Sequence, residues 1–106
     1  MAHLLAQAPE VEAVFVVSDL GAVGALMECL RRGIAVPGRI SVMGFGDFDI
    51  AAQCVPALTT IAVGALEIGR RAGTLLTGLL AGETAPDQRI DVGFTLISRA
   101  STASRR

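Results

Sequence analysis

Two polar residues that follow short apolar runs are the strongest candidates for chemistry in this sequence. Ser18 follows the run Ala13–Val17, and Asp47 follows Gly46 after the run Ile40–Phe45. Hydroxyl and carboxylate oxygens beside free backbone amides suit ligands that are rich in hydroxyl groups or that carry an anion. In open α/β sheets, ligands bind at the carboxyl ends of parallel strands, where these residues are expected to lie.

Each of these polar residues also has a purely structural interpretation. Asp19 is the expected N-cap of a helix that begins at Leu20, and Ser18 would serve the same helix end. Asp47 would equally cap a short helix over Asp47–Cys54. The sequence leaves the capping and the ligand-binding roles open at Ser18 and Asp47.

Catalytic patterns are missing from the sequence. His3 is the one histidine and stands at the chain terminus, where a solvated side chain is expected. The pair Gly44 and Gly46 lacks the third glycine of a nucleotide fingerprint, because Asp49 takes that place. Cys29 and Cys54 belong to no CxxC motif and are expected to be reduced thiols. We therefore expect no catalytic residue, no metal site, no cofactor and no enzymatic activity.

Composition narrows the class of protein further. A chain of 106 residues, 52% of them hydrophobic, forms one globular unit at most. Nine arginines, no lysine and ten acids give a net charge of -1, so this chain alone is not expected to bind DNA. Gln53 and Pro56 interrupt the charge-free stretch Ile50–Leu66, which argues against a membrane span. Nothing marks the N-terminus for export, which favours a cytoplasmic protein.

The elements that must position these residues alternate between strand and helix. The run Ala13–Val17 predicts a strand buried on both faces, and Leu20–Arg32 predicts a helix that ends at Gly33. Ala22, Leu26, Cys29 and Leu30 form its expected core face. The strand Ala13–Val17, the helix Leu20–Arg32 and the strand Ile40–Phe45 together predict a parallel βαβ unit.

The remaining chain continues the alternation, and the whole predicts an α/β fold with a mostly parallel sheet. The expected elements are a helix over Asp47–Cys54, a strand over Leu58–Val63, an amphipathic helix over Glu67–Ala81 and a final strand over Arg89–Ile97. The arginines at the end of the chain, Arg99, Arg105 and Arg106, are expected to be solvated.

An ordered set of motifs resembles the LacI/GalR family of transcriptional repressors. The motifs are SDLGAVGALMECLRRGIAVPGRISVMGFGDFD, VPALTTIAV, EIGRRAGTLL and ISRAST, and together they run from Val11 to Thr102. They are similar to the C-terminal part of the effector domain in that family. The run GFGDFDIA, followed by QCVPALTT, is most similar to the gluconate-utilisation repressors.

The resemblance implies a partial periplasmic-binding-protein-like (type I) fold of two lobes with a small-molecule effector between them. Residues 11–65 would belong to the second lobe, 66–92 would return to the first lobe, and 93–106 would form the final strand and tail. The chain would be a fragment that reaches DNA only through a helix-turn-helix headpiece that this chain lacks. It would have no membrane partner.

The resemblance also assigns roles to residues. Ser18 matches a position where relatives carry an effector-binding Asn or Ser, and Gly46 matches one where many relatives carry a sugar-binding Asp. The loss of that acid is compatible with a sugar acid such as gluconate, with Asp47 as a further ligand-binding candidate.

A homodimer is also expected. The apolar arc of the helix Leu20–Arg32 is wider than one core face requires, so its flank should cover another surface. In the family, this helix and the segment after GFGDFD contribute to the dimer interface, which here implies Val23, Met27, Ile50 and Cys54. Packing of the flank against the same protein is the alternative.

Two other functions fit parts of the sequence. A sugar-binding protein of a transporter would share the fold, but it would carry an export signal. A small α/β nucleotide-binding domain would need a phosphate loop, which this sequence does not contain.

Overall fold

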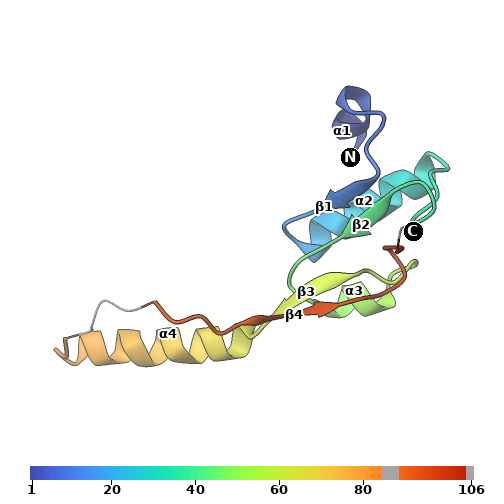
Figure 1. The fold of residues 1–106 in the computed structure, drawn as a ribbon. Coiled ribbons are helices and arrows are strands. Elements are labelled where there is room, and N and C mark those ends of the chain that lie inside the picture. Colours follow the sequence, from blue (N-terminus) through green and yellow to red (C-terminus); the bar gives the residue numbers. More distant parts are fainter. Residues whose placement is uncertain (85–88, 105–106) are drawn as a thin grey trace. The chain divides into compact units, whose positions relative to one another are not determined.

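The computed structural model describes residues 1–84 and 89–104. The chain divides into two compact units, each described here by itself. The first unit comprises Met1–Ala62 together with Thr95–Arg106, and the second comprises Val63–Phe94. Figure 1 shows the elements in chain order. The strand-end residues Ser18 and Asp47 both belong to the first unit.

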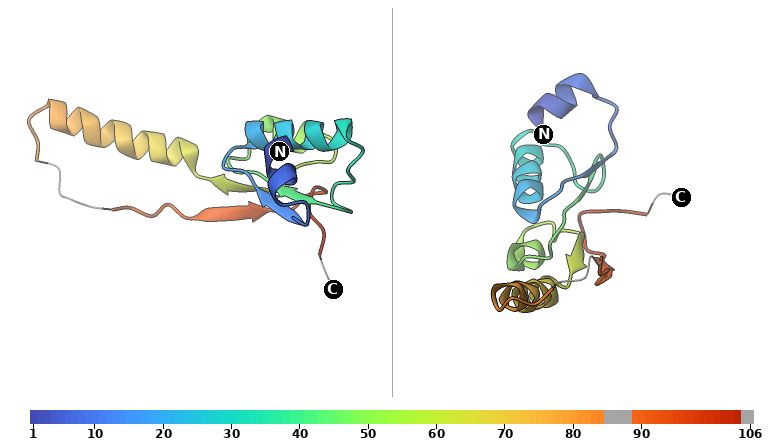
Figure 2. Two further views of the ribbon diagram at one scale, coloured as in Figure 1. Left: turned by 90° about the horizontal axis from the view of Figure 1, so that it is seen from above. Right: turned by 90° about the vertical axis from the view of Figure 1, so that its left-hand side faces the viewer.

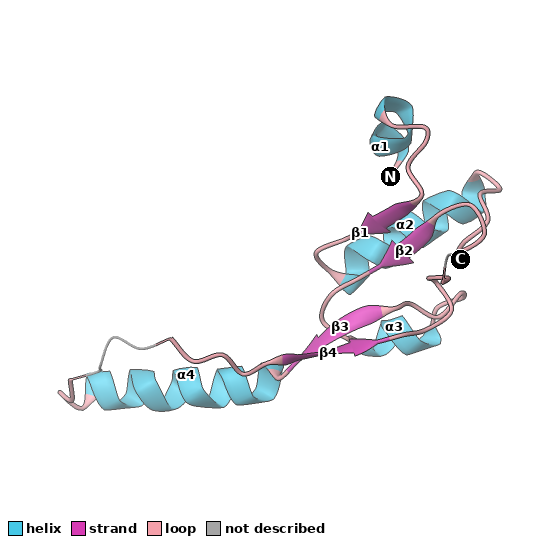
Figure 3. Ribbon diagram, in the orientation of Figure 1, coloured by secondary structure: helices cyan, strands magenta, loops and turns pink. Residues whose placement is uncertain are grey.

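The predicted βαβ unit is confirmed in the first unit. Strand β1 (Ala13–Phe15), helix α2 (Asp19–Arg31) and strand β2 (Ser41–Met43) follow one another, and the two strands pair in parallel with Val14 opposite Val42 (Figure 3). Both strands are shorter than their apolar runs. The expectation that the first strand is buried on both faces is wrong, because Phe15 is 54% exposed. Helix α2 lies along one side of these strands (Figure 2).

The ends of α2 follow from local chemistry. Gly33 has φ +68 and donates from its N–H to Leu30, while the N–H of Ile34 donates to the carbonyl of Cys29 at 2.8 Å. This is the Schellman arrangement, in which glycine takes the left-handed position without a Cβ clash. The predicted end of the helix is therefore confirmed. Its start differs, because Ser18 and not Asp19 occupies the N-cap.

The core of the first unit lies between α2, the parallel strands and the loop that precedes β3 (Thr60–Val63). Its buried apolar residues are Ala22, Ala25, Leu26, Ile40, Val42, Ala51 and Leu58. The placement of Leu30 on the core face is wrong, because its side chain is 79% exposed. Helix α3 (Asp49–Gln53) adds Ala51 to this core and packs against α2.

The C-terminal segment completes the first unit. Strand β3 pairs with β4 (Phe94–Ile97), and an isolated parallel bridge joins Met43 to Thr59. The buried Ser101 then spans two chain segments, because its Oγ donates to the carbonyl of Val42 at 2.6 Å and accepts from the N–H of Thr59 at 2.8 Å. Ser101 thus joins the middle of β2 to the residue that precedes β3.

The second unit contains helix α4 (Ala65–Leu80), which begins two residues before the prediction and ends one residue before it. In the part of the chain that the structure describes, no residue of α4 is buried. Its predicted apolar face is present, with Ile68 44% and Leu75 41% exposed. The final strand is shorter than Arg89–Ile97, since Gly93 takes φ +75 and donates to Asp91 just before β4.

Helix α1 (Ala2–Gln7) was not expected from the sequence. It buries none of its own residues, although Met1 and Leu5 pack against the core. Among the described residues, no helix is long and apolar enough to cross a membrane.

Candidate functional site

The residue before α2 offers a hydroxyl group that the helix does not use. Ser18 has extended backbone angles, φ -152 and ψ 140, and its carbonyl accepts from the N–H of Ala22 at 2.9 Å. Its side chain makes no capping hydrogen bond within the described residues. The capping interpretation of the Ser18 side chain is therefore wrong. Ser18 is half-buried and lies at the end of the short segment that connects β1 to α2.

Asp19 has a different role from the predicted one. Its side chain is fully buried and turns away from the helix end. Oδ1 accepts from Thr60 Oγ1 at 2.6 Å, and Oδ2 accepts from the N–H of Phe48 at 2.8 Å. The carboxylate thereby joins the start of α2, the loop after β2 and the start of β3. Two hydrogen bonds offset the loss of hydration on burial.

The loop after β2 is fixed by backbone contacts as well. The N–H of Gly44 donates to Thr59 at 2.9 Å, and the N–H of Gly46 donates to Ile61 at 2.8 Å. The N–H of Asp19 donates to the carbonyl of Phe45 at 3.0 Å. This last bond places Ser18, the preceding residue, beside the loop. The structure therefore brings Ser18 near the glycine-containing loop, as the sequence predicted.

Gly46 has a conformational reason for being glycine. Its φ is +123, which side-chain-bearing residues rarely adopt, and a Cβ there would stand 3.2 Å from the ring of Phe48. An acid at this position would need the loop to change its path. The loop conformation at this position therefore favours glycine.

Asp47 does not cap α3, because Phe48 occupies that N-cap. Its φ is 54, in the left-handed region, and its Oδ1 accepts from Nη2 of Arg99 at 2.8 Å. The Asp47 side chain remains 29% exposed, and that of Arg99 19% exposed. The expectation that Arg99 is a solvated tail residue is therefore wrong; Arg105 and Arg106 lie outside the described residues.

The sequence alone does not indicate a role for Arg99 at the site. Its Nη1 donates to the carbonyl of Leu58 at 3.0 Å, and its N–H donates to Thr59 Oγ1 at 2.9 Å. Its partner Asp47 is 52 residues away in the chain, so no local pattern indicated the pair. The one available signal in the sequence is its position two residues after the predicted strand Arg89–Ile97.

The four residues expected at a dimer interface lie on α2 and around α3. Met27 is 66% exposed and Ile50 is 37% exposed. Val23 and Cys54 are half-buried and pack partly against the core of their own unit. Leu20, on the same helix, is 66% exposed, so the wide apolar flank of α2 is present at the surface. The interface itself stays a prediction.

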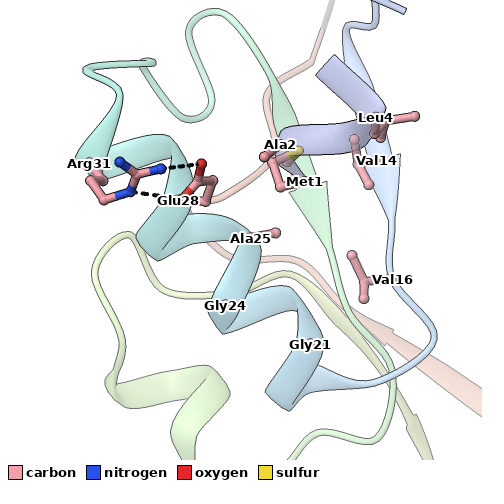
Figure 4. Close-up of a pocket in the computed structure, with 10 residues that line it drawn as sticks. All are labelled: Met1, Ala2, Leu4, Val14, Val16, Gly21, Gly24, Ala25, Glu28 and Arg31. Atoms are coloured by element: carbon pink, nitrogen blue, oxygen red, sulfur yellow. Dashed lines mark hydrogen bonds and ion pairs between the residues drawn. The ribbon is translucent and has the colours of Figure 1, made fainter. Parts of the chain in front are cut away.

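A pocket between α1 and α2 lies apart from these residues (Figure 4). Its volume is about 490 Å³, and neither Ser18, Gly46 nor Asp47 lines it. Glu28 and Arg31 form an ion pair at its wall, with Nη2 of Arg31 donating at 2.7 Å. Hydrogen bonds from the Arg31 and Arg32 side chains lower the pKa of Glu28 from 4.5 to about 2.

The remaining titratable side chains do not gather into a metal site. Among residues 1–84 and 89–104, no three His, Cys, Asp or Glu side chains are placed to hold a metal ion. Cys29 is buried, and burial, followed by the negative charge of Glu28, raises the pKa of its thiol.

Comparison with known proteins decides the family. The model of the periplasmic binding protein-like domain matches residues 1–102. The chain belongs to this family. Its predicted membership of the LacI/GalR regulators is also confirmed, because the similar proteins are LacI-type transcriptional regulators. The α/β, periplasmic-binding-protein-like fold class is confirmed with it.

Three relatives illustrate the similarity. The HTH-type transcriptional regulator GntR of Pseudomonas aeruginosa is 46% identical over 100 residues, which cover 94% of this chain and 29% of that regulator. The structure of GntR from Chromobacterium violaceum has a TM-score of 0.80 at 40% identity, covering 95% of this chain and 37% of that one. The transcriptional regulator CelR in complex with cellobiose has a TM-score of 0.86 at 33% identity, covering 94% and 31%.

These matches also bear on the alternatives. The proteins named are transcriptional regulators, which favours a regulatory function for this family member over an enzymatic one. The chain spans 29% of the length of the GntR regulator it matches, so the function of a whole regulator is not carried over directly.

Proposed function

We propose that this chain forms part of the effector-binding and dimerisation domain of a LacI-type transcriptional regulator that responds to a sugar acid such as gluconate. Residues 11–65 would contribute to the second lobe, 66–92 would return to the first lobe, and 93–106 would form the final strand and tail. DNA would be bound through a separate headpiece. The resemblance to gluconate-utilisation repressors and the similarity to GntR proteins support this assignment.

The observation that carries the proposal is the charge balance at the strand ends. Asp19 is fully buried and accepts two hydrogen bonds, and Asp47 is paired with Arg99. Gly46 adds no acid where many relatives have one. An effector carboxylate would therefore meet less negative charge here than in a site with a free aspartate. The hydroxyl of Ser18 and the exposed part of Asp47 would bind the sugar's hydroxyl groups.

The ligand proposal is tested by calorimetry on the full-length protein with gluconate and with neutral glucose. We expect gluconate to bind more tightly. Gly46→Asp adds a charge but also forces a side chain into a conformation at φ +123, whereas Gly46→Ala imposes the same backbone strain without the charge. We expect Gly46→Asp to weaken gluconate binding more than Gly46→Ala does, with no such difference for glucose. Equal effects of the two substitutions on gluconate would contradict the proposed specificity.

The dimer proposal places Val23, Met27, Ile50 and Cys54 against a second copy. Met27→Asp is the most informative substitution, since its exposed side chain contributes little to the core of its own unit. A charge inserted into an apolar interface should dissociate the dimer, measured by sedimentation. Leu66→Asp is the matched control, because Leu66 is 85% exposed and lies in the other compact unit. Unchanged dimer affinity of Met27→Asp would place the interface elsewhere.

A further inference from the structure

Asp47 is held in an unusual conformation at the proposed site. Among residues 1–84 and 89–104, it is the one residue other than glycine with a positive φ, at 54. It follows Gly46, whose φ is +123, and precedes Phe48, whose N–H is bound by the buried Asp19. Left-handed backbone in a residue with a side chain persists where neighbouring contacts hold it.

The contact on the side chain of Asp47 comes from Arg99, and Arg99 is itself fixed. Its guanidinium reaches both Asp47 Oδ1 at 2.8 Å and the carbonyl of Leu58 at 3.0 Å. Its backbone N–H donates to Thr59 Oγ1 at 2.9 Å, and its carbonyl accepts from that hydroxyl at 3.2 Å. Because these contacts already hold Arg99, its ion pair with Asp47 costs less conformational entropy than a pair between two mobile surface side chains.

The pair differs from the other ion pairs of the described chain. Those join residues three or four apart on exposed helix surfaces, as between Glu28 and Arg31 or Glu67 and Arg71. The pair of Asp47 and Arg99 joins residues 52 apart, and both side chains are mostly buried. Screening by solvent is weaker there, so the positive charge acts more strongly on its surroundings.

We infer that Arg99 is a positioning residue of the effector site, which orients Asp47 toward a hydroxyl group of the sugar acid and offsets the charge that Asp47 would otherwise present to the acid's carboxylate. This inference rests on the proposed function. Arg99 occupies one carboxylate oxygen of Asp47, and the exposed 29% of the Asp47 side chain remains available to the ligand. Removing Arg99 therefore leaves an unpaired acid beside an anionic effector.

The test is calorimetry on the full-length protein, with gluconate and glucose titrated into each variant. Arg99→Gln should weaken gluconate binding by about tenfold and glucose binding much less, because only gluconate meets the uncovered charge. Arg99→Lys keeps the charge and should retain most of the preference for gluconate. Asp47→Asn should raise the gluconate-to-glucose affinity ratio, since asparagine tolerates the left-handed conformation and removes the acid.

Arg39→Gln is the matched control. Arg39 also donates from its guanidinium to two backbone carbonyls, those of Val11 and Pro9, but it precedes β2 while Asp47 follows it. Its substitution should change stability without changing the affinity ratio. If urea unfolding shows that Arg99→Gln does not fold, the gluconate-to-glucose affinity ratios of Arg99→Lys and Asp47→Asn decide whether Arg99 has the inferred role.

The outcomes separate two failures. If the unsubstituted protein binds glucose as tightly as gluconate, or binds neither, the proposed function is overturned and the inference with it. If it prefers gluconate but Arg99→Gln weakens both ligands equally, or Asp47→Asn leaves the ratio unchanged, only the role of Arg99 is overturned. A fall in the ratio for Arg99→Gln and a rise for Asp47→Asn supports it.

Discussion

Replacement of Gly44 by alanine tests whether the buried carboxylate of Asp19 organises the site. A Cβ on Gly44 would overlap Oδ1 of Asp19 and would stand 2.9 Å from Cδ2 of Leu58. Gly44 is buried, so the added methyl group has no solvent to enter. Asp19 would have to turn, and its hydrogen bonds to Thr60 Oγ1 and to the N–H of Phe48 would lengthen or break.

The expected magnitude follows from these contacts. Overpacking of a close-packed core costs about 1–3 kcal/mol. A hydrogen bond to a charged group contributes about 1.5–3 kcal/mol, and two such bonds are weakened here. Partial relaxation of the core keeps the destabilisation below the sum of the overpacking cost and the two hydrogen-bond contributions. We therefore expect Gly44→Ala to lower the free energy of unfolding by about 3 kcal/mol. Urea unfolding of the full-length protein measures it.

Gly24→Ala makes the same chemical change with the opposite expected sign. Gly24 lies inside α2, and a Cβ there meets no atom within 4 Å. Alanine should therefore stabilise the helix by about 0.5–1 kcal/mol. A Gly44→Ala protein whose unfolding free energy stayed within about 0.5 kcal/mol of the unsubstituted protein would refute the reasoning. So would strict additivity with Thr60→Val, because that substitution already removes one of the two hydrogen bonds.

Three further predictions concern charge, thiol chemistry and DNA. Because the folded pKa of Glu28 is lowered to about 2, its ion pairs stabilise the fold above pH 4.5 and lose that effect as the pH falls toward 2. Glu28→Gln should flatten stability against pH in that window, and an unchanged curve would contradict this. Cys29 should react with iodoacetamide more slowly than Cys54, because its thiol is buried and becomes accessible only when the protein unfolds. Equal reaction rates of the two thiols in the folded protein would be inconsistent with the burial of Cys29. This chain alone should not retard operator DNA in a low-salt gel shift, since its net charge is -1; sequence-specific retardation would contradict that.

The elements that could be predicted are those whose signals are local. The strand, helix and strand around α2 were found because a β-branched run gives way to a period of 3.6 residues. The end of α2 was found because Gly33 supplies the left-handed residue that a Schellman motif needs. The boundaries of the strands were less accurate, because pairing partners and not apolar composition decide where a ladder ends.

The parts that could not be predicted depend on residues far apart in the chain. Asp19 looked like a helix cap because its type and position suit one, yet its partners Phe48 and Thr60 lie 29 and 41 residues away. Arg99 looked like part of a solvated tail for the same reason. Leu30 fits the helical period of the core face, but no neighbouring element among the described residues covers it, and it stays 79% exposed. Periodicity indicates a face; packing determines whether that face is buried.

The two acids that follow the parallel strands differ in burial, and this difference separates the structural role of Asp19 from the binding role proposed for Asp47. Asp19 is fully buried with both oxygens occupied, so any replacement leaves donors unpaired in the core, and the fold opposes change at this position. Asp47 is partly exposed, and its side chain pairs with Arg99, which a separate segment of the chain contributes. Substitution there alters a charge and a surface more than it alters the core. If the proposed effector site is right, we expect effector preference to change through Gly46, Asp47 and Arg99, while the hydrogen bonds of Asp19 keep the loop in place.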